Sequence, residues 1–190
     1  MTRAVSADDI LDAALGIAAD CHWETVRLAD VAASLDIPLA DIHRHFPDKE
    51  SLVDALWNRA DAALLAGAED SALPGMDVPE RLEQLVFTWL NALAPYRRTV
   101  REMLLVRLEP GHLHIQVPAL LRVSKTVQWL REAAGLRAAF AWRALEETAL
   151  TTLFIATFTA WLRDGKRARE ILRGGLHAAR AVRTRIGPPD

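Results

Sequence analysis

The amino-acid sequence predicts an all-α protein. No segment alternates apolar and polar residues over several positions, as a half-buried strand would. Alanine, leucine and arginine, which are good helix formers, recur throughout the chain. Proline and glycine interrupt the helical pattern at intervals that leave roughly nine helices.

The first three predicted helices are short. Asp8 and Asp9 begin a helix that ends near His22, since acidic side chains suit the positive end of a helix. A second helix covers about 28–35 and a third about 39–45. They are separated by Pro38, which fixes its own φ at the first helical position and disfavours helix in the residue before it.

Longer helices follow. Asp48 is a candidate N-cap, with Ser51 three residues later, for a helix that reaches about Ala68. Turn-forming residues concentrate at 70–79, where we place the boundary between two domains, 4–64 and 79–186. Beyond it, breakers such as Pro95, Pro110 and Gly135 leave helices at about 79–94, 96–109, 117–134, 139–163 and 168–185.

Composition favours a folded protein in a reducing compartment. Of 190 residues, 51% are hydrophobic and 25% are charged, which is too apolar for a disordered chain. Cys21 is the single cysteine, which excludes an internal disulfide. We find no signal segment, and the most apolar stretch, 144–162, contains Glu146 and Glu147. We expect a cytoplasmic protein without a membrane span.

Charge is divided unevenly along the chain. Residues 1–59 carry five basic and eleven acidic side chains, a net charge of −6 within a total of −2. The remainder therefore carries +4. An acidic N-terminal segment is unfavourable for contact with nucleic acid, whose phosphates are neutralised by lysine and arginine.

Separated pieces of the N-terminal third match one known pattern in order and at the right spacing. The pieces are Ile10-Leu-Asp-Ala-Ala14, Val31-Ala32, Ile42-His-Arg-His-Phe46 and Lys49-Glu-Ser-Leu52. They resemble the N-terminal domain of TetR-family regulators. The resemblance implies a helix-turn-helix at 27–46 in a DNA-binding domain, followed by a helical domain that binds an effector and dimerises.

In such a motif the second helix braces the third, whose exposed residues enter the major groove while flanking donors hold phosphates. The resemblance places these residues at or beside DNA: Arg27, Leu39, Ala40, Asp41, His43, Arg44, His45 and Lys49. Ile42 and Phe46 are expected in the core. For Arg44 and Lys49 the alternative is an ordinary surface side chain.

The motif departs from the family pattern at four positions. Asp36 stands where glycine is usual, Pro38 replaces serine or threonine, and His43 replaces a tyrosine that binds phosphate. Asp41 lies in the third helix, where it either accepts a hydrogen bond from a cytosine amine or repels the backbone. His43 and His45 form a His-x-His pair, but they point to different faces and lack a third ligand, so we expect no metal.

Large apolar side chains accumulate from the fourth predicted helix onward, where five of the six tryptophans lie. Apolar residues at helical spacing either line a cavity for an apolar effector or fill a core; they are Val86, Trp89, Leu90, Met103, Leu104, Leu120, Val127, Leu130, Leu153 and Phe154. The helix at 139–163 is apolar on more than one face, so one face needs a partner. With the resemblance, this predicts a homodimer that contacts through Leu150, Phe158, Trp161, Leu172 and Leu176 and binds a palindromic operator.

Parts of the C-terminal region also resemble a second group of proteins. Ala94-Pro-Tyr-Arg-Arg98, Leu120-Leu-Arg122 and Trp161-Leu-Arg-Asp164 loosely resemble a TetR subgroup that includes a lipid-binding accessory protein of ubiquinone biosynthesis. That likeness implies an isoprenoid-binding protein that has lost DNA binding. An enzyme is disfavoured, because no nucleophile elbow, phosphate loop or Cys-His pair occurs, and no cofactor is expected.

Overall fold

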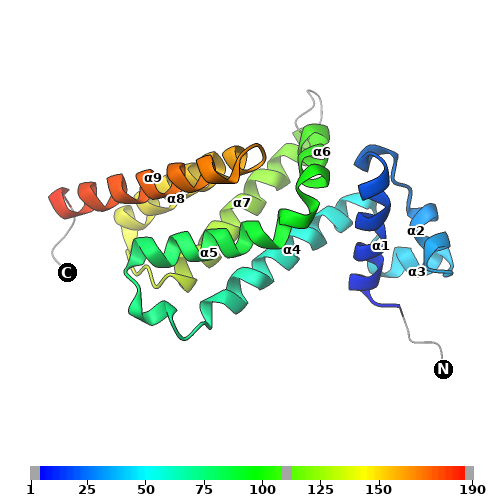
Figure 1. The fold of residues 1–190 in the computed structure, drawn as a ribbon, viewed down its shortest axis with the longest axis horizontal. Helices are drawn as coiled ribbons and strands as arrows, with labels where there is room; N and C mark the ends of the chain where they lie inside the picture. The colour runs from blue at the N-terminus through cyan, green and yellow to red at the C-terminus, as the bar shows by residue number, and fades with distance from the viewer. Residues whose placement is uncertain (1–4, 108–112, 187–190) are drawn as a thin grey trace. The chain divides into compact units, whose positions relative to one another are not determined.

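The computed structural model describes residues 5–107 and 113–186 and, within them, all side chains except those of 106, 107, 113–121, 184 and 186. The described residues form helices and turns with no strand, which confirms the all-α prediction (Figure 1). The chain divides into two compact units. The first comprises residues 1–59 and 93–113, and the second comprises 60–92 and 114–190.

The first unit contains the short N-terminal helices. They are α1 (Ala7–Asp20), α2 (Leu28–Ser34) and α3 (Leu39–His45), with a 3-10 turn, η1 (Trp23–Thr25), after α1. The start of α4 (Lys49–Ala68), the 3-10 turn η3 (Ala94–Tyr96) and α6 (Arg97–Arg107) complete this unit. The predicted bounds of α2, α3 and α4 agree with the structure within a residue.

Local chemistry sets these helix starts. At α1, Ser6 and Asp9 form a capping box, in which each side chain accepts a hydrogen bond from the backbone N–H of the other. At α4, the Asp48 carboxylate accepts from the Ser51 N–H at 2.7 Å, which confirms Asp48 as the N-cap. The core of the unit is apolar and includes Ile10, Leu11, Leu15, Val31, Ile42, Phe46, Leu52 and Leu56.

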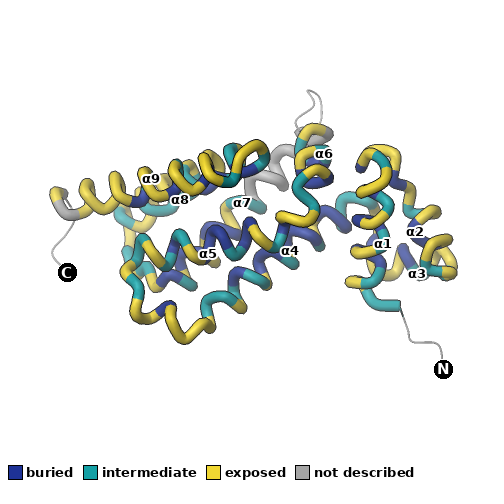
Figure 2. Tube along the Cα trace, in the orientation of Figure 1, coloured by how far each residue is buried: buried dark blue, intermediate teal, exposed yellow. Residues whose placement is uncertain are grey.

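The second unit contains the longer helices. The rest of α4 is followed by the 3-10 turn η2 (Leu73–Gly75), α5 (Val78–Leu93), α7 (Leu113–Ala133), α8 (Phe140–Trp161) and α9 (Gly165–Ile186). Helices α8 and α9 lie side by side along most of their length (Figure 1). Helix α9 turns Leu172 and Leu176 inward and leaves most other positions exposed (Figure 2).

Two helices begin earlier than the sequence predicted. Helix α9 begins at Gly165 rather than 168 because the Asp164 carboxylate accepts from the Lys166 N–H at 2.8 Å and caps the first turn. Helix α7 begins at Leu113 rather than 117. Residues 70–79, where the sequence placed a domain boundary, lie inside the second unit.

Within the described residues, no helix combines the length and apolar character needed to span a membrane.

Candidate functional site

The turn between α2 and α3 is built around a left-handed residue. Asp36 has φ +52°, and the N–H groups of Asp36 and Ile37 donate to the carbonyls of Ala33 and Ala32 at 3.2 and 3.1 Å. This hydrogen-bond pattern is a Schellman motif, which usually places glycine at the left-handed position. The short polar side chain of aspartate tolerates this conformation better than most, so the departure at Asp36 preserves the turn.

Helix α3 presents most of its side chains to solvent. Ile42 is fully buried and Phe46, which follows the helix, is 6% exposed, so both belong to the core as predicted. Five of the predicted DNA-contacting residues of α3 are exposed: Leu39, Ala40, His43, Arg44 and His45. Leu39, at the start of the helix, is 52% exposed.

Charged side chains on this surface already have partners. Arg44 forms an ion pair with Asp41 one turn earlier on α3, so the aspartate does not face solvent as an isolated anion. Arg27, the N-cap residue of α2, is exposed. Two acidic side chains of α1 are also engaged, because Arg59 of α4 contacts Asp12 at 2.5 Å and Asp8 at 2.9 Å.

Lys49, a predicted phosphate contact, lies at the first position of α4 and is turned inward. Its ammonium donates to the carbonyl oxygens of Trp23 and Glu24 at 2.5 and 3.0 Å and lies 4.9 Å from the centre of the Trp23 ring. Burial lowers the pKa of Lys49 below its ordinary value, although the Glu24 carboxylate opposes this shift. Lys49 therefore holds η1 against the start of α4.

Two residues of α6, Glu102 and Arg98, also hold η1 in place, and the sequence did not indicate them. The Glu102 carboxylate accepts from the Trp23 N–H at 2.8 Å and contacts His22 Nδ1 at 3.0 Å. Arg98 donates to Glu102 at 3.1 Å and to the Cys21 carbonyl at 3.1 Å. Burial alone would raise the pKa of Glu102, but these hydrogen bonds outweigh it and hold the pKa below its ordinary value.

The predicted pocket residues divide between the two units. Met103 and Leu104 lie on α6 in the first unit, whereas the others with described side chains lie in the second. Leu120 belongs to α7, but its side chain lies outside the described residues. The side chains of Val86, Trp89, Leu90, Val127, Leu130 and Phe154 are buried. A cavity of about 10 Å³ borders Val86, Leu130, Leu153 and Phe154, so this interior is closely packed.

A buried polar cluster lies in the same unit. Asp61 of α4 is 6% exposed and accepts hydrogen bonds from the Trp89 indole N–H, the Thr126 hydroxyl and the Arg122 guanidinium. Of these four residues, the sequence indicated a role only for Trp89, as part of the lining of an apolar pocket. The available signal was Asp61 itself, because it occupies a position on the otherwise apolar face of its helix.

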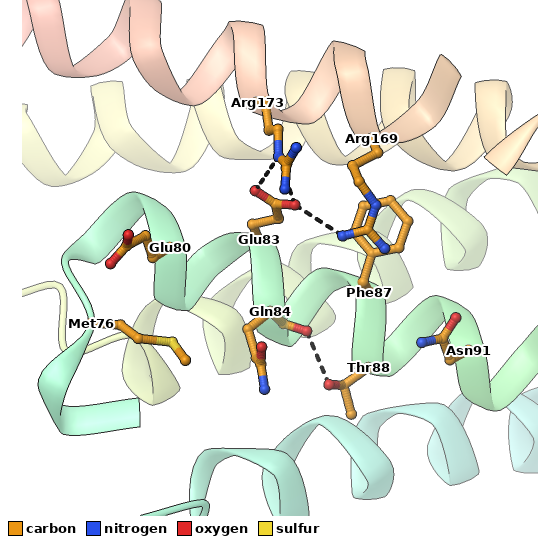
Figure 3. Close-up of a pocket in the computed structure, with 9 residues that line it drawn as sticks. All are labelled: Met76, Glu80, Glu83, Gln84, Phe87, Thr88, Asn91, Arg169 and Arg173. Atoms are coloured by element: carbon orange, nitrogen blue, oxygen red, sulfur yellow. Dashed lines mark hydrogen bonds and ion pairs between the residues drawn. The ribbon is translucent and has the colours of Figure 1, made fainter. Parts of the chain in front are cut away.

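An open groove of about 460 Å³ runs along α5 and α9 (Figure 3). The Glu83 carboxylate of α5 forms ion pairs with two arginines of α9, Arg169 at 3.0 Å and Arg173 at 2.8 Å. The Arg169 guanidinium also lies 3.9 Å from the centre of the Phe87 ring. Polar side chains dominate its lining, so it differs from the apolar pocket that the sequence predicted.

The predicted dimer residues have unequal exposure. Trp161, Leu172 and Leu176 are at most 5% exposed and pack inside this chain. Leu150 and Phe158 are half-buried. Phe158 instead stacks on Trp161 and lies edge-on to Trp89, with ring centres 6.0 and 5.6 Å apart.

These features define an all-helical protein with an N-terminal helix-turn-helix and a second helical unit. No family model and no curated protein matches the sequence. Among solved structures, a TetR transcriptional regulator from Nitrosomonas europaea ATCC 19718 is 41% identical, with a TM-score of 0.82, over 92% of this chain and 98% of that chain. The chain therefore belongs to the TetR family of transcriptional regulators.

Two further solved structures are more distant. A TetR-family regulatory protein from Rhodococcus RHA1 is 22% identical over 93% of this chain and 97% of that chain, with a TM-score of 0.48. A structure from Shewanella sp. PV-4, also placed in the TetR family, is 17% identical over 91% and 94%, with a TM-score of 0.51. At this identity the Shewanella structure bears on the fold alone.

Proposed function

We propose that the protein is a homodimeric transcriptional regulator that binds palindromic DNA through α3 and is controlled by an apolar effector in its second unit. The observation that carries this proposal is the exposed face of α3. A helix with Ile42 and Phe46 buried and Leu39, His43 and Arg44 exposed has the arrangement that places side chains in a major groove. The proposal puts the protein in the cytoplasm.

The exposed face of α8 supports the homodimer. Between Ala144 and Thr159, every exposed position is uncharged. Three exposed threonines, Thr148, Thr152 and Thr159, donate their hydroxyls to carbonyls one turn earlier at 2.7–2.8 Å and so present their methyl groups outward. With Leu145 and Ile155, 51% and 40% exposed, they form an apolar strip suited to a second copy.

The test is salt-dependent binding to the DNA upstream of the protein's own gene. We expect specific binding that weakens as salt rises, because cationic groups displace counterions from phosphates. Arg44→Ala should weaken binding, whereas Lys166→Ala, which removes an exposed cation from α9, should leave it unchanged. Absence of specific binding at low salt would overturn the proposal.

Lys49→Ala separates two roles of one side chain. A phosphate contact predicts weaker binding to all sequences and a log–log salt slope smaller by about one. The intramolecular contacts with Trp23 and Glu24 predict a lower Tm. Unchanged affinity together with a lower Tm would assign Lys49 to the scaffold, and unchanged affinity at constant Tm would contradict our placement of the motif.

A lipid-binding accessory protein is the second candidate function. Its support is that Arg44 and Lys49, two of the few cations available to α3, are engaged within the chain. The −6 charge of residues 1–59 points the same way. Isoprenoid lipid that co-purifies with the protein, together with no specific DNA binding, would favour this function over regulation.

A further inference from the structure

The buried cluster around Asp61 joins three helices of the second unit. Its carboxylate accepts from the Trp89 Nε1–H and the Thr126 Oγ1–H, both at 2.9 Å, and from Arg122 Nη2 at 2.7 Å. Trp89 and Thr126 are at most 3% exposed, and the Arg122 side chain is 15% exposed. Donors from α5 and α7 thus converge on one carboxylate from α4.

This donor set suits an oxyanion, and the oxyanion that it holds is the Asp61 carboxylate. An arginine guanidinium keeps its charge throughout the physiological pH range, and a largely buried one needs a compensating anion. Charge-assisted hydrogen bonds to a carboxylate are roughly twice as strong as neutral ones. The cluster is therefore a carboxylate receptor whose present occupant, Asp61, comes from the chain itself.

A row of aromatic rings lies next to the polar cluster and shares Trp89 with it. The Trp89 indole donates to Asp61, and the same ring packs edge-on against Phe154 and Phe158, with ring centres 5.1 and 5.6 Å apart. Phe158 then stacks on Trp161 at 6.0 Å. A molecule that contacts both regions would carry an acidic head group and an apolar body.

Close packing implies that such a molecule changes the unit when it binds. The apolar cavity beside Val86, Leu130 and Phe154 measures about 10 Å³, which is space for one water molecule at most. An apolar body can enter only if the surrounding side chains separate. Differential binding to an opened form is what a regulatory ligand requires.

We infer that the effector is an apolar carboxylic acid whose carboxylate competes with Asp61 for Arg122. This inference rests on the proposed effector control and names the ligand class. Because Asp61 is held beside Arg122 by the fold, it competes at a high effective concentration. Removing its charge should therefore strengthen binding of an external acid.

The experiment compares decanoate with decanol, which has a chain of the same length but no charge. Calorimetric titration of the full chain should show decanoate binding more tightly than decanol, but by less than about tenfold, because in the wild-type chain the acid must displace Asp61 from Arg122. Asp61→Asn should widen this preference. Arg122→Met should abolish it, and Lys125→Met, which removes an exposed cation from α7, should leave it intact.

The inference is wrong if the wild-type chain and the Asp61→Asn variant both bind decanoate and decanol equally. It is also wrong if Asp61→Asn binds neither probe. A preference for decanoate that survives Arg122→Met would overturn it as well. The Asp61→Asn comparison decides the matter if Arg122→Met does not fold. DNA binding measured without a probe separates the proposals. DNA binding without acid preference overturns only this inference, whereas acid preference without DNA binding supports the receptor and overturns the regulator.

Discussion

Helices α2 and α7, one in each unit, end in the same hydrogen-bonded motif with different residues at its left-handed position. The paired bonds are Ile37 to Ala32 and Asp36 to Ala33 after α2, and Leu136 to Arg131 and Gly135 to Glu132 after α7. Asp36 has φ +52° and Gly135 has φ +74°. Glycine adopts this conformation freely, whereas aspartate retains a Cβ that disfavours it. The turn between α2 and α3 therefore has, at its left-handed position, a residue that favours this conformation less than glycine does.

The two units also hold a half-buried glutamate differently. Glu102 in the first unit accepts a backbone N–H, that of Trp23, in addition to its side-chain partners. Among the described residues, Glu83 in the second unit contacts the side chains of Arg169 and Arg173, which are 45% and 59% exposed, and no backbone N–H. Water can replace Glu83 at those guanidiniums, but it reaches the Trp23 amide less easily. Loss of the Glu102 side chain should therefore cost more stability than loss of the Glu83 side chain.

The largest expected effect comes from Glu102→Ala. It leaves the Trp23 N–H without its acceptor and should lower the free energy of unfolding by about 2 kcal/mol. Glu83→Ala, the matched change in the second unit, should cost less than about 1 kcal/mol, as exposed ion pairs do. Urea unfolding of both variants measures the difference. Equal losses would remove the distinction between the units.

Adjacent glycines on α9 give the next effect. A Cβ at Gly175 would collide with the end of Leu153 on α8, with Cδ2 at 2.9 Å, whereas a Cβ at Gly174 would meet open space. Gly175→Ala should therefore destabilise the chain by about 1–2 kcal/mol. Gly174→Ala should stabilise it by up to about 1 kcal/mol through helix propensity. Thermal unfolding distinguishes the two, and a shared sign would contradict the packing of α8 on α9.

The Schellman turns provide a smaller and direct test of the first comparison. Gly135→Ala should destabilise the chain by about 1 kcal/mol, because alanine is strained at positive φ. Asp36→Gly should stabilise it by no more than about 0.5 kcal/mol, since the strain it relieves is offset by unfolded-state entropy. Chemical denaturation measures both. Loss of stability in Asp36→Gly would show that the aspartate side chain contributes more than its backbone conformation costs.

The smallest effect is expected in the pH dependence of stability. Hydrogen bonds hold the pKa of both Glu102 and Glu83 below the ordinary 4.5, although burial opposes the shift. A lowered pKa contributes stability that is complete above the ordinary value and is lost as pH falls through the folded value. Glu102→Ala and Glu83→Ala should each lose less stability than the wild-type chain between neutral pH and pH about 3. A curve parallel to the wild type would show that the carboxylate does not contribute.

Local signals predicted the recognition motif because the determinants lie close together in the sequence. Pro38 is the N-cap residue of α3 and Asp48 caps α4, and both act within a turn of their own position. The burial of Ile42 and Phe46 was implied by the resemblance to the family motif. The same reasoning identified the residues of α3 that face solvent. Their contact with DNA stays a prediction.

Contacts between distant residues were beyond the reach of sequence reasoning. Glu102 meets Trp23 across 79 positions and Arg122 meets Asp61 across 61. Neither spacing has a periodic signal, because such pairs depend on how helices pack rather than on how each one forms. Likewise, the division of apolar residues on α8 between the core and the exposed strip depends on which face α9 covers.

The sequence by itself determined the helices, the turn before α3 and the family resemblance, since these depend on backbone preferences and patterns within short segments. Only the tertiary structure decided that Lys49 and Glu102 hold η1, and that Asp61 lies inside a set of donors. Those roles arise when helices far apart in the chain bury polar groups together, and burial requires each group to find a partner.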